Sequence, residues 1–307
     1  MNTRERITGI IVALVAPFDS DGRIKFDILQ KHVDFLINQG VDGFYVNGST
    51  GESLLMSQDE REDILNAVLD ANNGRKAVIC HCGAVSTDLS RELIIHATEA
   101  GADAVSSIPP FYYHFSEEEI ACYYDDLANA SDKPFIVYNM PSFSGVTITE
   151  NLMARIKRNP HISGLKFTHS DFYTMQQIKS AFPDLVVYNG FDEMAISGFA
   201  MGADGAIGST YNVLAPYFLQ IRQMCKQNDF QQALGVQSAA NEIIKMLVGT
   251  GKLFASLKYV ISSIEGMDYG VCRKPFATLS SEDIKICKQV VNRINNWRSN
   301  SVSSFIA

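Results

Sequence analysis

One lysine lies inside an apolar run that has the composition of a buried strand. Lys166 stands in the segment 162–167, which reads ISGLKF. If its side chain points into an apolar interior, burial disfavours the ammonium form, lowers the pKa of the lysine and leaves a free amine that can attack a carbonyl carbon. In the alternative interpretation, Lys166 is structural, and its ammonium group reaches solvent or pairs with a carboxylate.

A short loop with two glycines and two hydroxyl residues is a candidate anion-binding site. It covers residues 48–51 and reads GSTG. Glycines let backbone N–H groups approach a ligand, and the hydroxyls of Ser49 and Thr50 add donors that carry no charge. A plain turn whose hydroxyls bond to the backbone is the alternative. The loop has neither the pattern of a serine hydrolase nor that of a nucleotide triphosphatase.

Further polar residues follow other apolar runs. Tyr138 ends one such run and is a candidate site residue, and a core aromatic residue is the alternative. Asp192 and Glu193 follow another run, and an acidic pair that opens a helix is the alternative. The remaining residues picked out at the ends of such runs are Thr168, Gly190 and Ser209.

We predict no metal and no cofactor. The sequence Cys80-His81-Cys82 could suggest a metal site. Side chains alternate along a strand, however, so His81 is expected on the face opposite the two sulfur atoms, and no second ligand pair follows. The glycines in 202–208 lie across a predicted strand, which is the wrong position for a dinucleotide-binding loop.

These candidates need a scaffold that brings distant residues together, and the pattern of the chain predicts one. Short β-branched runs alternate with helical patterns, and Ser57 and Ser116, each followed by acidic residues, are typical helix starts. A strand followed by a helix eight times over predicts an α/β fold, a (β/α)8 TIM barrel, whose active site lies at the carboxyl ends of the strands. The predicted strands are 9–15, 43–47, 77–82, 103–108, 135–139, 162–167, 185–189 and 204–208.

Beyond residue 212 only helical patterns remain, at 214–224, 230–247, 253–264 and 281–297. We therefore expect a barrel over residues 1–212 with the active site at its strand ends. Residues 213–307 are expected to form a C-terminal helical extension packed on the barrel, because no Pro-, Gly- or Ser-rich linker separates the two parts.

Composition limits the partners. The 307 residues carry 26 Lys+Arg against 34 Asp+Glu, a net charge of −8, which argues against a nucleic acid partner. No run approaches the ~20 apolar residues of a membrane span. The apolar run 7–18 resembles a short signal peptide but lacks a cleavage motif and is interpreted as the first strand. The six cysteines are sparse, so we expect reduced thiols and a cytoplasmic location.

At the candidate residues the chain resembles the pyruvate-dependent class I aldolase family that includes dihydrodipicolinate synthase and N-acetylneuraminate lyase. The resemblance runs from about residue 8 to residue 297. It rests on GSTGE at 48–52, FYY at 111–113, YNMP at 138–141, GLKFT at 164–168, YNGFDE at 188–193, GAIGSTYN at 205–212 and CRKPF at 272–276.

The resemblance implies a small-molecule substrate and roles for the candidates. Lys166 would form a Schiff base with the ketone of a sugar acid, and Tyr138 would move a proton to or from its C4 hydroxyl. Ser49 and Thr50 would bind the substrate carboxylate. Tyr112 would reach the active site of a neighbouring subunit in a homotetramer. The residues implied to bind the polyol tail are Thr168, Gly190, Asp192, Glu193 and Ser209.

One position separates the branches of the family. Synthases usually carry an arginine two residues after the proline of the Tyr-Asn-x-Pro motif, where this chain has Phe143. A neutral ring cannot pair with a second carboxylate, so the resemblance favours the lyase branch and retro-aldol cleavage of N-acetylneuraminate. The alternatives are cleavage of another 2-keto-3-deoxy sugar acid, a non-catalytic sugar-acid sensor and a metal-dependent aldolase.

Overall fold

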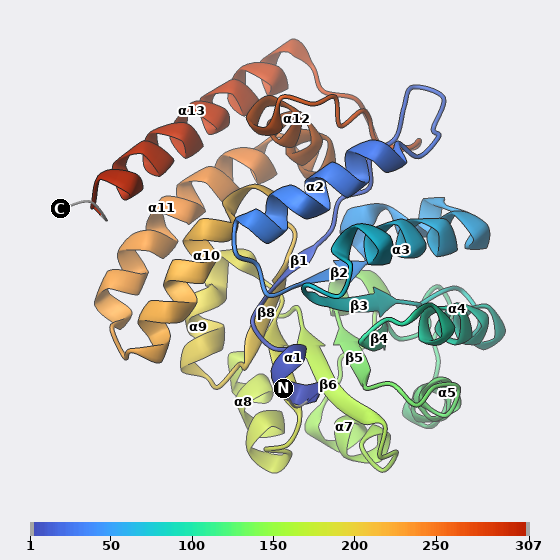
Figure 1. The fold of residues 1–307 in the computed structure, drawn as a ribbon. Helices are drawn as coiled ribbons and strands as arrows, with labels where there is room; N and C mark the ends of the chain where they lie inside the picture. The colour runs from blue at the N-terminus through green and yellow to red at the C-terminus, as the bar shows by residue number, and fades with distance from the viewer. Residues whose placement is uncertain (1–2, 305–307) are drawn as a thin grey trace.

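Eight parallel strands close into a barrel in chain order, with β1 paired to both β2 and β8 (Figure 1). The computed structural model describes residues 3–304, and it confirms the predicted barrel and its strands. The strands are β1 Ile10–Ala13, β2 Gly43–Val46, β3 Ala77–His81, β4 Ala104–Ser107, β5 Phe135–Asn139, β6 Ile162–Phe167, β7 Val186–Asn189 and β8 Gly205–Gly208.

Helices cover the outside of the barrel between successive strands. The predicted starts at Ser57 and Ser116 are confirmed, and both form capping boxes, with Glu60 and Glu119 respectively. Ahead of β8 the helices are α1 Thr3–Arg6, α2 Phe26–Asn38, η1 Ser49–Gly51, η2 Ser53–Leu55, α3 Gln58–Asn72, α4 Thr87–Ala100, α5 Glu117–Ala128, α6 Pro141–Ser144, α7 Glu150–Ile156, α8 Phe172–Ala181, η3 Asp192–Met194 and α9 Ala195–Ala200.

Strand alternation sorts side chains into two packed layers. On β1, Ile11 and Ala13 belong to the small cluster inside the barrel, whereas Ile10 and Val12 belong to the large cluster between the strands and the helices. Lys166 pairs in register with Tyr138 on β5 and Tyr188 on β7. Neighbours in register on parallel strands point to the same face, so the three side chains share the inner side of the sheet.

The segment after β8 is helical and packs along one side of the barrel (Figure 1). Its helices are α10 Tyr211–Lys226, α11 Phe230–Gly249, α12 Leu253–Glu265 and α13 Ser281–Ser304. Buried residues of this segment, such as Leu257 and Ile294, belong to the same apolar cluster as the outer layer of the barrel. No helix in residues 3–304 is long and apolar enough to cross a membrane.

Candidate active site

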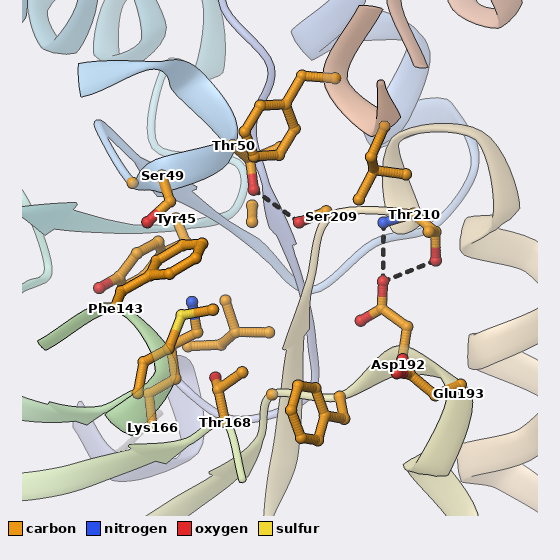
Figure 2. A pocket seen from close by; sticks show the side chains of 18 of the residues that line it. Tyr45, Ser49, Thr50, Phe143, Lys166, Thr168, Asp192, Glu193, Ser209 and Thr210 are labelled. Atoms are coloured by element: carbon orange, nitrogen blue, oxygen red, sulfur yellow. Dashed lines mark hydrogen bonds between the residues drawn. The ribbon is translucent and has the colours of Figure 1, made fainter. Parts of the chain in front are cut away.

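A cavity of about 210 Å³ opens at the carboxyl ends of the strands (Figure 2). The structure brings together at this cavity every substrate-binding and catalytic residue predicted from the sequence. These residues are Ser49, Thr50, Tyr138, Lys166, Thr168, Gly190, Asp192, Glu193 and Ser209. Figure 2 shows Lys166 near Tyr45 on one side of the cavity and Asp192 with Glu193 on the other.

Lys166 is buried, with 5% of its surface exposed, and has aromatic neighbours in place of a counter-ion. Its Nζ lies 3.9 Å from the centre of the Tyr138 ring and 4.4 Å from that of Tyr45. Among residues 3–304, no carboxylate oxygen lies within 4.0 Å of this nitrogen. Burial lowers the pKa of Lys166 to about 7, and the charge of Asp192 opposes the shift. Much of the amine is therefore unprotonated and nucleophilic near neutral pH.

Tyr138 faces Lys166 across the strand pair β5–β6 and is almost fully buried. Its hydroxyl donates to Met140 Sδ at 2.8 Å. Burial raises the pKa of Tyr138 to about 12, while the side chains of Thr168 and Ser49 oppose the rise. The phenol therefore keeps its proton at neutral pH and acts as a donor, unless a base next to it accepts that proton.

The loop after β2 presents hydroxyl groups and no cation. Ser49 and Thr50 lie in the single turn η1, and Thr50 Oγ1 is 2.7 Å from Ser209 Oγ. Gly48 is required by close packing, because a Cβ there would lie 2.9 Å from the Tyr45 ring. Neutral donors on tightly packed backbone suit a carboxylate whose charge is balanced elsewhere in the site.

Asp192 supplies a buried acceptor on the opposite side. The backbone N–H and the hydroxyl of Thr210 donate to its Oδ2 at 2.8 and 2.7 Å. Its Oδ1 is buried and has no hydrogen-bond partner in the part of the chain described. Burial raises the pKa of Asp192 to about 6, so it is mainly a carboxylate at neutral pH. An unpartnered acceptor in a cavity is suited to a ligand hydroxyl.

Two glycines leave room for these groups. A Cβ on Gly190 would fall 1.9 Å from Thr168 Oγ1, and one on Gly208 would fall 1.9 Å from Asp192 Oδ1. Only glycine fits at either position without displacing a polar group of the cavity.

Sequence analysis missed part of the cavity wall. The helices α11 and α12 contribute apolar side chains opposite the strands, and β2 contributes Tyr45 from inside the barrel. The strand-end rule did not select them, because they follow no strand. Phe143, noted earlier as a departure from the synthases, also lines the cavity. The wall residues from α11 and α12 are Ile244, Val248, Leu253 and Phe254.

Two other predictions from the sequence, for Tyr112 and for residues 80–82, can be compared with the structure. Tyr112 does not line this cavity; its side chain is 86% exposed. Cys80 and Cys82 pack in the outer layer, while the ring of His81 contacts Tyr45 and Tyr138 on the inner side, as strand alternation predicts.

A closed eight-stranded barrel that holds a buried lysine beside a tyrosine at its strand ends has the architecture of a class I aldolase. More specifically, the chain belongs to the dihydrodipicolinate synthetase family, whose model matches residues 6–294. The family resemblance inferred from the sequence motifs is thereby confirmed.

Three individual proteins, one similar in sequence and two similar in structure, illustrate which members of the family the chain resembles. The chain is 39% identical over 297 residues to an N-acetylneuraminate lyase of Rhizobium meliloti strain 1021, covering 96% of this chain and 98% of the relative. A catalytic lysine mutant of the Ruminococcus gnavus sialic acid aldolase superposes with a TM-score of 0.94 at 32% identity, covering 96% of this chain and 98% of that one. CdNal from Clostridium difficile, solved in complex with mannosamine, gives 0.91 at 34% identity, covering 94% and 99%.

Proposed function

We propose that the protein is an N-acetylneuraminate lyase, which cleaves this sialic acid to pyruvate and N-acetylmannosamine. The observation that carries the proposal is Lys166, buried beside Tyr138 without a carboxylate within 4.0 Å of its Nζ in the described chain. The names of similar proteins, an N-acetylneuraminate lyase and a sialic acid aldolase, support the choice of sugar acid.

The reaction follows from the state of these two groups. The free amine of Lys166 attacks the C2 ketone of the open-chain sugar, and loss of water gives a protonated imine. Tyr138 passes its own phenol proton to the substrate carboxylate and in turn takes the proton of the C4 hydroxyl. The C3–C4 bond then breaks, its electron pair moves toward the iminium nitrogen, and an enamine and the free aldehyde result. Protonation of the enamine at C3 and hydrolysis release pyruvate and the amine.

The remaining residues bind the two ends of the substrate. Ser49 and Thr50 offer neutral donors to the carboxylate, whose charge is balanced by the imine at Lys166. Asp192, through its unpartnered Oδ1, and Glu193 accept hydroxyl groups of the polyol. Phe143 occupies the position from which synthases of the family offer an arginine, which supports a neutral polyol over a second carboxylate.

We also propose a catabolic enzyme of the cytoplasm that assembles as a homotetramer. The free thiols of Cys80, Cys82, Cys225 and Cys287 are buried, as suits a reducing compartment. Tyr112 is exposed and has a φ of 81°, an uncommon conformation for a bulky residue that contact with a second subunit would help to hold. We propose the division into a barrel at 1–212 and a helical extension at 213–307 as well.

The decisive experiment compares two substrates. Purified protein is given N-acetylneuraminate or 2-keto-3-deoxygluconate, and pyruvate release is measured. We expect a clear preference for N-acetylneuraminate; a preference for the second sugar acid would contradict the proposal. In parallel, borohydride with pyruvate should trap an adduct on the peptide that contains Lys166, and an unchanged peptide mass would exclude the imine.

A further inference from the structure

His81 lies at the end of β3, directly behind the cavity. Only 3% of its surface is exposed, and it is not among the residues that line the cavity. Its ring nevertheless contacts the end of β2, the end of β4 and the Tyr138 ring. His81 can therefore influence the cavity only through the residues that it contacts.

Two hydrogen bonds fix the tautomer of His81. Its Nδ1 is 3.0 Å from the carbonyl oxygen of Asn47, and the backbone N–H of Ile108 donates to its Nε2 at 3.3 Å. A carbonyl only accepts and a backbone N–H only donates, so the proton sits on Nδ1 and Nε2 accepts. Burial and the guanidinium of Arg61 hold the pKa of His81 at about 3, so the ring stays neutral.

The first bond anchors the hydroxyl loop. Asn47 has a φ of 60°, a left-handed conformation that costs free energy in any residue but glycine. Its carbonyl is held by His81, and its Nδ2 donates to the carbonyl of Arg61 at 2.8 Å. Because Asn47 is followed directly by the loop that carries Ser49 and Thr50, the His81 bond sets where that loop begins.

The ring itself supports the phenol. His81 meets Tyr138 edge to face, with 6.0 Å between ring centres and an interplanar angle of 88°. Tyr45 closes the triangle, at 5.9 Å from His81 and 6.1 Å from Tyr138. The amine of Lys166 lies over the two tyrosine rings. Displacement of His81 therefore frees the Tyr138 ring to turn away from Lys166.

We propose that His81 is a positioning residue that couples the carboxylate-binding loop to the Tyr138 phenol. This inference rests on the proposed function, because it assigns His81 a part in the same reaction. The two contacts are separable: Nδ1–H fixes the loop, and the ring edge fixes Tyr138. Their loss should therefore affect different kinetic constants.

Two variants separate the contacts. His81→Asn can keep a donor near the Nδ1 position but removes the ring; we expect an unchanged pyruvate concentration for half-maximal borohydride trapping and a kcat for cleavage lowered about tenfold or more. His81→Phe keeps a ring but removes both hydrogen bonds; we expect the half-saturating pyruvate concentration to rise about tenfold, with a smaller loss in kcat. Thermal melting reports whether each variant is folded.

One further variant tests the position of the His81 ring, and two control variants test whether replacing any histidine would have the same effect. Gly83→Ala leaves the His81 side chain in place but puts a Cβ 2.9 Å from both His81 Nε2 and Ser107 Oγ, so it should shift the ring and also lower kcat. The controls are His96→Asn and His96→Phe on α4, where His96 pairs with Glu62 away from the cavity; both should leave the kinetics unchanged.

The kinetic pattern decides the inference. The inference is supported if His81→Asn lowers mainly kcat and His81→Phe raises mainly the half-saturating pyruvate concentration. Parent-like constants in the folded variants, or equal changes in both constants for both variants, would overturn it and leave His81 as ordinary core. If the parent protein itself fails to trap pyruvate, the proposed function fails instead.

Discussion

Two lysines are buried among residues 3–304, and they differ in their polar partners. Lys166 in the cavity and Lys258 on α12 are 5% and 1% exposed, and each ammonium nitrogen lies over an aromatic ring. Lys258 Nζ is 2.5 Å from Glu52 Oε1 and donates to the carbonyl of Val271 at 2.7 Å. Lys166 has neither a carboxylate within 4.0 Å nor a hydrogen-bond acceptor assigned to it in the described chain.

The difference shows how one residue type serves two purposes. Burial lowers the pKa of both lysines, but for Lys258 the adjacent Cys272 and Glu52 oppose the shift at short range. The pair of Lys258 with Glu52 joins the helical extension to the loop after β2. The unpaired lysine is free to lose its proton and become a nucleophile. Both lysines are buried, so what separates them is the absence of a carboxylate oxygen within 4.0 Å of Lys166 Nζ in residues 3–304.

The largest effect is expected from Lys166→Met. Cleavage should fall by at least about 10⁴-fold, and pyruvate with borohydride should leave no adduct, because the nucleophile is gone. Below pH 7 the same variant should be more stable than the parent by up to about 5 kcal/mol, because burial of the protonated Lys166 costs the parent folding free energy that a methionine does not cost.

The sign of that stability difference provides the control. The folded-state pKa of Lys166 is about 7, below the value in an unfolded chain. The buried Lys166 therefore lowers the free energy of unfolding of the parent by its full amount below pH 7. This difference shrinks as the pH rises toward the pKa of a free lysine. Chemical denaturation at several pH values measures it, and a destabilised Lys166→Met protein at pH 7 would contradict the cost assigned to this burial.

An intermediate effect is expected from Lys258→Met, which leaves the Glu52 carboxylate buried without its cation. Such a change costs about 3–5 kcal/mol of folding free energy. The double variant Lys258→Met with Glu52→Gln should recover most of that loss, because no buried charge remains. The folded single variant should still trap pyruvate on Lys166. Loss of trapping in a folded protein would mean that the two lysines are not functionally distinct.

The smallest expected effect is the pH dependence of adduct formation by the parent protein. We expect the rate of adduct formation at low pyruvate concentration to rise with pH, level off above about pH 7 and fall about tenfold per unit well below it, following the free amine. Trapping with cyanoborohydride and mass spectrometry measures it. A rate that still climbs above pH 9 would show that Lys166 titrates like an exposed lysine.

Much of the fold and the site was predictable from local sequence. The strands are short β-branched runs at regular spacing, and the barrel rule places active-site residues where such runs end. Asp192, Lys166 and Thr50 were found in this way. Family motifs then supplied the roles that residue types alone left open.

Other parts depend on neighbours that local patterns do not encode. Ile244 and Val248 follow a helical pattern that looks the same whether the helix faces a core or a cavity. Strand alternation predicted that His81 faces away from Cys80 and Cys82, but not its bonds to Asn47 and Ile108, because those depend on the register of three strands. The pairing of Lys258 with Glu52 likewise joins segments far apart in the chain.

The cavity wall from α11 and α12 has a consequence for engineering. Ile244, Val248, Leu253 and Phe254 come from a stretch of chain separate from the strands that carry Lys166 and Tyr138. The proposed catalytic residues and this part of the cavity wall are therefore encoded in different parts of the gene. A directed-evolution library confined to that stretch can search for new substrates while the proposed catalytic residues stay unchanged.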